Sequence, residues 1–319
     1  MNPEELFGAK ILYRRLMGLS IFSLLVFLLP IVVRDTYHLE ILFLCHYYVI
    51  LACSWDLLTG FTGNVNFGHA FFIGGAGFTG ALLNMHLGWG YWLTIPIGGV
   101  VAALFGLLVG SFTLRLRGPY FAAVTFCFAT LLYKWIMIRN DIFGGEEGLP
   151  GIDWLMDSAL GNYFFSGIFM LAVVFFLYFL SKSPFGLILR SIGENETASE
   201  GSGINTTYYK IVAFVISAFI AGMAGAMYGH AQMHVGPEMA HDGLSALVLM
   251  MAVVGGMGSI IGPIIGAYLL TLVNESLRFM GEFRLLIYSS AVVAVILFAP
   301  KGLLDIITRG FRHLPGQER

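Results

Sequence analysis

Charged residues are scarce in this 319-residue chain: Asp, Glu, Lys and Arg together make up 11%. An ordinary soluble domain carries about 25% charged residues, so a soluble fold could not cover its surface here. Cysteine is also rare, with three residues, which excludes a secreted module held by disulfides. The formal net charge of -2 and the lack of a long basic run argue against nucleic-acid binding. A hydrophobic fraction of 58% excludes intrinsic disorder and leaves a polytopic membrane protein.

A nucleotide-binding loop of the form G-x-x-x-x-G-K-[ST] is also missing, because no lysine follows the required glycine pattern. If ATP drives this protein, another polypeptide must therefore supply the ATPase. Cys45, Cys53 and Cys127 do not have the spacing of metal ligands. We expect no metal site and no cofactor bound by this chain.

Long apolar runs dominate what is present. A helix needs roughly 20 apolar residues to cross about 30 Å of hydrocarbon. The sequence predicts an all-α, single-domain bundle (residues 1–319) with about ten such runs: 17–33, 39–59, 64–84, 91–113, 119–138, 161–181, 210–229, 242–258, 260–277 and 284–300. The third, eighth and ninth are rich in glycine and could be half-helices or re-entrant segments. We interpret the first as a retained helix, since no small-residue cleavage site follows it.

The distribution of positive charge predicts the orientation. With the N-terminus inside and an even number of spans, most of the 17 Lys and Arg residues fall on the inner side. The acidic loop 139–160 then lies outside. The N-terminus (1–16), the loop 182–209 and the tail (301–319) lie in the cytoplasm.

The inner loop 181–210 contains a predicted docking helix. Ser183 is a good N-cap, and Pro184 suits the first helical position. Phe185, Ile188, Leu189 and Ile192 form one apolar stripe at helical spacing. Three glutamates follow the helix, which argues against an interfacial helix on anionic lipid and favours a cytoplasmic partner protein.

Two glycine-rich segments, 60–74 and 255–266, occupy the two halves of the chain. Paired breaks of this kind indicate a substrate pathway, because half-helix N-termini can receive a carboxylate. Asn64, Asn66 and His69 add polar groups beside the first break. The alternative is that these groups only satisfy unwound backbone.

Three further features allow other interpretations. Asp56 could bind a coupling ion in a secondary transporter, or make a helix-end contact. Ser259 could be a nucleophile, but a tight turn between two spans is the simpler interpretation. Small residues every four positions, from Ser217 to Gly229, predict close helix packing within the subunit or at a dimer interface. Glu275 and Arg278 are spaced for an ion pair.

Several segments resemble one known family. Leu116-Arg117-Gly118-Pro119-Tyr120-Phe121-Ala122 resembles its LRGPYFA motif, and residues 144–152 resemble its GG-x-DGLPGI loop. Residues 60–82, 183–229 and 254–263 also resemble conserved stretches, in the same order, across about 40–305. The family is that of the permease subunits (LivM-type) of branched-chain amino-acid ABC importers. The chain departs from the motifs at Asn66-Phe67 and Gly201-Ser202, where Ser-Leu or a similar pair is usual, and at Phe143, where Thr is usual.

The resemblance implies a subunit of the bacterial inner (plasma) membrane that works by alternating access. Its partners would be a second, LivH-type permease, two P-loop ATPases that bind ATP-Mg, and a periplasmic amino-acid-binding protein. A urea or short-amide importer of the same superfamily is the nearest alternative.

We therefore expect three groups of functional residues. The substrate pathway would include Gly60, Gly63, Asn64, Asn66, Gly68, His69, Gly74, Gly255, Gly256, Gly258 and Gly262. Coupling to the ATPase would involve Ser183, Pro184, Phe185, Gly186, Ile188, Leu189, Arg190, Glu194, Asn195, Glu200 and Gly203, with Arg190 and Glu194 as a local pair or as partner contacts. The binding protein would dock on Glu146, Glu147, Leu149 and Pro150.

Overall fold

The computed structural model describes residues 18, 20–116, 118–281, 283–298 and 302–305. The predicted N-terminal segment 1–16 and most of the predicted tail 301–319 lie outside these residues. The described chain is almost entirely helical, as the composition predicted.

The helices follow the predicted apolar runs closely. After a helix at Ser20–Val32 come α2 (Thr36–Thr62), α3 (His69–Leu87), α4 (Tyr91–Thr113), α5 (Pro119–Ile138), α6 (Asn140–Phe143), α7 (Ala159–Lys182), α8 (Pro184–Glu194), α9 (Glu196–Gly201), α10 (Thr206–Gln232), α11 (Asp242–Gly255), α12 (Ile261–Ser276) and α13 (Phe283–Phe298). Two short 3-10 helices, η1 (Pro237–Ala240) and η2 (Arg278–Met280), and a two-stranded antiparallel ladder of β1 (Leu149–Pro150) and β2 (His234–Val235) complete the fold.

Six of the described helices are long and apolar enough to cross a membrane: α2, α3, α4, α5, α7 and α10. This confirms a polytopic helical membrane protein. The other apolar helices are shorter: α12 and α13 have 16 residues each and so span about 24 Å, against about 30 Å of hydrocarbon. The count of ten spans and the cytoplasmic termini stay predictions.

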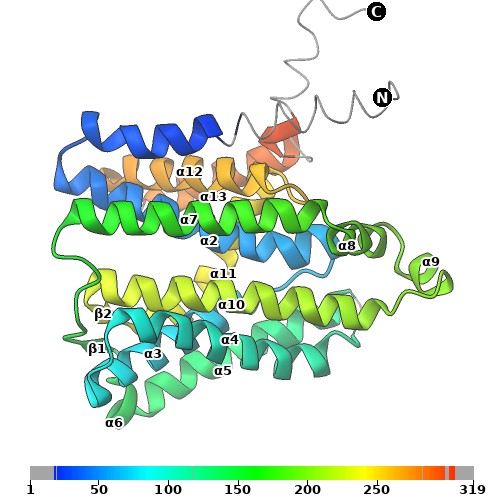
Figure 1. Cartoon of the computed structure of the whole chain (residues 1–319), viewed down its shortest axis with the longest axis horizontal. Helices are drawn as coiled ribbons and strands as arrows, with labels where there is room; N and C mark the ends of the chain where they lie inside the picture. Colours follow the sequence, from blue (N-terminus) through cyan, green and yellow to red (C-terminus); the bar gives the residue numbers. More distant parts are fainter. Residues whose placement is uncertain (1–17, 19, 117, 282, 299–301, 306–319) are drawn as a thin grey trace, which may run out of the picture.

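The long helices lie side by side along the long axis, with two different ends (Figure 1). The short helices α8 and α9 lie at one end, and α6, β1 and β2 lie at the opposite end. The predicted inner loop and the predicted outer loop are therefore on opposite sides of the bundle.

Helix α2 is the centre of the bundle and is buried along almost its whole length. It packs against α7, α10 and α12, while α10 packs most extensively against α4 and α3. The small residues of α10 allow its close packing against α4 and α3. A methyl group on Gly222 would lie 2.3 Å from the Cβ of Ala102, and one on Gly225 would lie 2.3 Å from the carbonyl oxygen of Ile73. The predicted close packing within the subunit is confirmed.

The third helix begins at His69 rather than near residue 64. Gly63 ends α2 in a left-handed conformation (φ 75°), and its N–H donates to the carbonyl of Thr59. The side chain of Asn66 then accepts the N–H of Gly68 at 2.8 Å. These local bonds satisfy the backbone without a helix, so residues 63–68 form a separate segment.

Candidate functional site

The first glycine-rich break, between α2 and α3, is held by hydrogen bonds to α2. The hydroxyl of Thr59 donates to the carbonyl of Asn64 at 3.0 Å, and the indole of Trp55 donates to the carbonyl of Asn66 at 2.7 Å. Asn66 is buried, whereas Asn64 is half-buried. The chain therefore turns back along α2 instead of leaving the bundle.

Helix α3 starts inside the bundle. The Nε2 atom of His69 lies 3.0 Å from the hydroxyl of Ser54, which is two turns before the end of α2, or about 12 Å along the helix. His69 is fully buried, and among the described residues its Nδ1 atom has no hydrogen-bond partner. A buried polar atom without a partner calls for an explanation, and a ligand group is one.

The first turn of α11 meets the first turn of α3. The N–H of Ala70 donates to the hydroxyl of Ser245 at 2.8 Å, and Gly74 lies directly against Ala240 of η1. Helix α11 has 14 residues and therefore a length of about 21 Å. Ser245 in its first turn is buried, whereas His241 and Gly243 at its N-terminus are exposed. A short helix that begins beside the start of α3 is the arrangement expected of a broken-helix pathway.

The second glycine-rich break joins α11 to α12 through residues 256–260. Gly256 and Gly258 have positive φ angles, 115° and 74°, which favour glycine. A methyl group on Gly255 would lie 1.9 Å from the carbonyl of Gly262, so the two helices leave the turn in backbone contact. Ser259 accepts the N–H of Gly262 at 3.1 Å and so stabilises the start of α12. This is the tight turn that the sequence predicted.

The two breaks touch each other at the end of α2. A methyl group on Gly60 would lie 2.5 Å from the backbone nitrogen of Gly258. That nitrogen donates to Oδ1 of Asp56 at 2.9 Å. The structure thus brings one group of predicted pathway residues together near Asp56, and a second group lies deeper, at the start of α3. In this conformation the glycines are contact points between packed backbones.

The helix predicted in the inner loop is confirmed as α8, whereas its docking role stays a prediction. Ser183 caps it by accepting the N–H of Gly186, and Pro184 is its first residue. Its apolar stripe, however, faces the subunit itself: Leu189 and Ile192 are buried in the core, and the ring of Phe185 lies 5.8 Å from that of Tyr209. Leu189 is therefore not a direct contact for a partner in this conformation. Leu187, which the sequence analysis did not single out, is 59% exposed.

Arg190 of α8 also turns inward. Its guanidinium group lies over the ring of Phe61 at 4.8 Å, and it makes a long 3.5 Å contact with the carbonyl of Gly258. It makes no ion pair with Glu194 among the described residues, so the predicted local pair is wrong. The apolar turn of α2 and the 256–260 turn attract the side chain away from the helix surface.

Helix α9 is tied to the start of α10. The ammonium group of Lys210 is buried and lies 2.6 Å from Oε1 of Glu196, and the hydroxyl of Thr206 donates to Glu200 at 2.9 Å. The predicted coupling residues Asn195 and Gly203 set the geometry here: Asn195 caps α9, and Gly203 has a φ of 84°. Nothing in the spacing of Glu196 and Lys210, 14 residues apart, pointed to this pair.

A polar hollow of about 270 Å³ opens between α8 and α9. Its lining consists of Ser191, Glu194, Asn195, Ala198, Ser199, Ser202 and Ile204. Glu194 is exposed at its edge. Together with Leu187, this hollow makes the α8–α9 end a surface with both apolar and acidic features.

The predicted outer loop is a fixed structure at the other end. Leu149 pairs with Val235 in the β1–β2 ladder, and Asp153 exchanges two hydrogen bonds with Asn84, at 2.7 and 3.0 Å. Glu146, Glu147 and Pro150 are exposed, whereas Leu149 is buried and cannot contact a partner directly. Trp154 is 60% exposed beside them.

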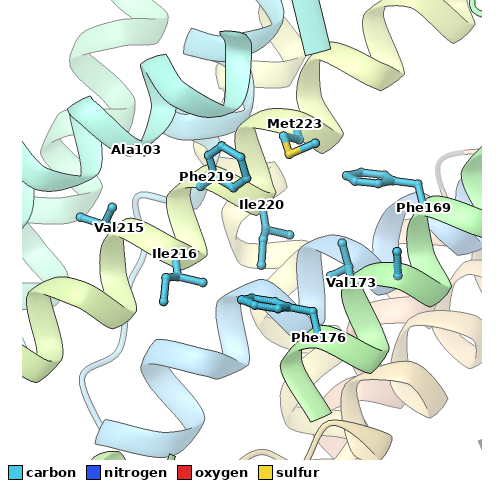
Figure 2. A pocket seen from close by; sticks show the side chains of 10 residues that line it. Ala103, Phe169, Val173, Phe176, Val215, Ile216, Phe219, Ile220 and Met223 are labelled. Carbon is cyan, nitrogen blue, oxygen red and sulfur yellow. The ribbon is translucent and has the colours of Figure 1, made fainter. Parts of the chain in front are cut away.

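A larger hollow, of about 410 Å³, lies between α4, α7 and α10 (Figure 2). Every residue that lines it is apolar: Ala103, Phe169, Ala172, Val173, Phe176, Val215, Ile216, Phe219, Ile220 and Met223. Such a lining does not stabilise the two charges of a free amino acid. Its position on the sides of membrane-length helices suits contact with hydrocarbon.

The remaining sequence expectations have structural outcomes of their own. Glu275 and Arg278 form the predicted ion pair at 3.0 Å. Cys45 and Cys53 are buried in α2, and Cys127 is exposed on α5. Within the described residues, no three His, Cys, Asp or Glu side chains gather as metal ligands.

Comparison with known proteins places this geometry in context. Residues 37–300 match the family model described as "Branched-chain amino acid transport system / permease component". The chain is 30% identical over 301 residues to the high-affinity branched-chain amino acid transport system permease protein LivM of Salmonella typhimurium, covering 85% of this chain and 71% of the relative. It is 31% identical over 288 residues to the Escherichia coli K12 LivM protein, covering 81% and 68%.

A more distant relative has a different substrate in its name. The autoinducer 2 import system permease protein LsrC of Escherichia coli O9:H4 is 29% identical over 236 residues, covering 70% of this chain and 68% of the relative. No solved structure matches the chain.

Proposed function

We infer the function from one premise: the chain belongs to the family of permease components of branched-chain amino acid transport systems. It is a multi-pass protein of the bacterial inner membrane and a permease subunit of an ABC importer. We propose that it carries branched-chain amino acids from the periplasm to the cytoplasm by alternating access. The observation that carries the proposal is the family match across residues 37–300.

The α8–α9 end supports the assignment of a coupling surface. An ABC permease must receive the conformational change of an ATPase through a rigid surface element. Helix α8 is capped at Ser183, packed on the core through Leu189, and followed by α9, which Lys210 fixes to α10. We propose that the ATPase docks on the outer face of α8, at Leu187, and on the polar hollow beside it, with Glu194 at its edge. The nucleotide and its magnesium ion belong to that partner.

The substrate pathway that we propose runs where the first turns of α3 and α11 meet. Helix N-termini carry partial positive charge and favour carboxylates. In this structure side-chain oxygens occupy N–H groups at the start of α3 and just before it: Ser245 accepts from Ala70, and Thr125 accepts from Phe67 at 3.1 Å. We propose that opening exchanges these oxygens for the carboxylate of the amino acid, beside the imidazole of His69.

The assembly that we propose has the parts expected from the resemblance. A second, LivH-type permease would complete the transmembrane unit, two P-loop ATPases would bind the α8–α9 ends, and a periplasmic amino-acid-binding protein would deliver substrate to the exposed part of loop 144–154. A urea or short-amide importer is the alternative for the substrate.

Affinity purification of the tagged chain from its native membrane tests this proposal. We expect P-loop ATPases, a second permease and a binding protein in defined proportion. Reconstituted in liposomes, the complex should take up labelled leucine, isoleucine or valine only with ATP inside. Urea uptake without amino-acid uptake would change the proposed substrate from a branched-chain amino acid to urea or a short amide. A chain that transports without any ATPase would overturn the proposal and favour an ion-coupled carrier.

A further inference from the structure

Three separate elements meet at the turn between α11 and α12. The backbone N–H of Gly258 donates to Asp56 of α2 at 2.9 Å, and its carbonyl faces Arg190 of α8 at 3.5 Å. The end of α2 presses on the same residue at Gly60, where a methyl group would lie 2.5 Å from the nitrogen of Gly258. Gly258 is thus contacted on both sides, at its N–H and at its carbonyl, by two ionisable side chains of different helices.

Both charged side chains are incompletely satisfied. Asp56 is fully buried, and its Oδ2 atom has no hydrogen-bond partner among the described residues. The Nε atom of Arg190 is also buried and has no hydrogen-bond partner among the described residues, although its guanidinium lies over the ring of Phe61. Burying a charged group is costly unless it is paired and hydrogen-bonded. The presence of two buried, incompletely satisfied ionisable groups at one turn therefore calls for an explanation beyond packing.

Helix α8, the proposed coupling helix, is in backbone contact with the end of α2. A methyl group on Gly193 would lie 2.3 Å from the carbonyl oxygen of Phe61, so no side chain separates the two elements. A displacement of α8 must therefore move either the end of α2 or the adjoining turn, because packed interfaces shift between discrete arrangements rather than deform.

The turn is also connected to the proposed pathway. Helix α11 ends at Gly255, three residues before Gly258, and its first turn holds Ser245, whose hydroxyl accepts the N–H of Ala70 in the first turn of α3. A helix of 14 residues transmits a displacement along its length as a rigid body. Movement imposed on the turn at one end therefore reaches the contact between the two half-helix N-termini at the other.

We propose that Asp56 and Arg190 are positioning residues for transport: they clamp Gly258 from α2 and α8, so that movement of the coupling helix is transmitted through α11 to the pathway. This assignment rests on the proposed function. It replaces the ion-site interpretation of Asp56, because a single carboxylate oxygen that accepts a backbone N–H is a poor cation site. Within the described residues, no cluster of acidic or histidine ligands surrounds it.

The test measures uptake and ATP hydrolysis together in the co-purified complex, reconstituted with its binding protein and supplied with labelled leucine. In Asp56→Ala we expect hydrolysis to stay within about twofold of the unmodified complex, while leucine carried per ATP falls at least about tenfold. Asp56→Asn keeps an oxygen for the N–H of Gly258, so its loss should be only about threefold. Glu40→Gln, an exposed acid on the same helix, is the matched control and should change neither quantity.

A double substitution tests whether both residues act through one turn. Asp56→Ala combined with Arg190→Gln should lower the transport ratio no further than the stronger single substitution, because the shared contact is already lost. Arg190→Lys keeps the charge and should retain more transport than Arg190→Gln.

Two results would overturn the clamp. In the first, uptake and hydrolysis fall by the same factor in every variant, which is the behaviour of a structural defect. In the second, the two losses multiply in the double variant. If the Asp56→Ala complex does not assemble, the leucine carried per ATP in Asp56→Asn and in the Arg190 variants tests the clamp instead. Failure of the proposed function looks different, because then no ATPase co-purifies with the unmodified chain.

Discussion

Two ionisable side chains are buried near the α8–α9 end, and their charges are balanced differently. Asp56 accepts the backbone N–H of Gly258 at 2.9 Å, whereas Lys210 lies 2.6 Å from a carboxylate. The Lys210 side chain is 1% exposed and the Glu196 side chain 25%. A pair of this kind contributes little net stability, but removal of one partner leaves an uncompensated charge. Its role here is to fix α9 against α10.

Substitution of Lys210 should therefore be more harmful than removal of the whole pair. We expect Lys210→Met to lower the free energy of unfolding by about 1–3 kcal/mol, which is less than the roughly 3–5 kcal/mol for a fully buried pair because Glu196 remains partly hydrated. Lys210→Met with Glu196→Gln should recover most of this loss. Thermal unfolding of the purified chain in detergent measures both. The exposed pair of Arg139 and Asp141 is the control, and Arg139→Gln should barely shift the midpoint.

A double variant as unstable as Lys210→Met alone would contradict this account, since the lysine would then act through its packing rather than its charge.

At the residue scale, the sequence predicted local features such as helix caps, but it did not predict contacts between distant helices. Ser183 and Pro184 marked the start of α8 correctly, because capping depends on a few adjacent residues. Arg190 and Glu194 were expected to form a local pair or to contact a partner, and within the described residues Arg190 contacts Gly258 rather than Glu194. That contact, like the pair of Glu196 and Lys210, depends on how distant helices pack, which spacing along one helix does not report.

At the scale of elements, the amphipathic stripe of α8 was identified correctly but assigned to the wrong side. Apolar residues at helical spacing show that one face is buried, not against what it is buried. Leu189 and Ile192 pack on the subunit itself, so the docking surface that we propose lies on the opposite face of α8. In a membrane protein the lipid-exposed surface is also apolar, and hydrophobicity alone does not separate these cases.

This arrangement predicts which substitutions on α8 prevent docking. Leu187→Asp places a charge on an exposed face, so the subunit should fold normally but lose co-purifying ATPase by at least about tenfold, as expected for an interface anchor. Phe185→Asp should lower both docking and thermal stability, because Phe185 also packs on Tyr209. The measurement is the ATPase-to-permease ratio in the purified complex, beside the unfolding midpoint of each variant.

Leu160→Asp serves as the matched control, because Leu160 is an exposed leucine at the other end of the bundle. An unchanged ATPase ratio in Leu187→Asp, with normal uptake, would remove the outer face of α8 from the docking surface.

The broken helices show the same division between local and long-range information. The glycines near residues 60 and 255 were expected to interrupt helices, and they do. What the sequence did not reveal is that the interruptions touch each other through Gly60 and Gly258, and that α3 and α11 begin at the same contact. The start of α3 was misplaced by five residues because the hydrogen bonds of Asn66 compete with helix formation.

At the scale of the whole molecule, the two ends of the bundle have separate structural supports (Figure 1). The α8–α9 end depends on Lys210 and on the contacts around Gly258. The other end depends on the β1–β2 ladder and on the hydrogen bonds between Asn84 and Asp153. Since none of these contacts is shared, changes at one end should leave binding at the other intact, while transport requires both.

Charge reversal on the outer loop tests this separation. Glu146 and Glu147 are exposed beside the ladder, so Glu146→Lys with Glu147→Lys should leave folding and ATPase co-purification unchanged. We expect it to weaken stimulation of ATP hydrolysis by the periplasmic binding protein several-fold, and more strongly at low salt, because exposed charges steer association over about a Debye length. Titration of the binding protein against hydrolysis, at two salt concentrations, measures the effect. Stimulation that is unchanged at both salt concentrations would place the docking surface elsewhere, whereas loss of the ATPase itself would show that the two ends are not independent.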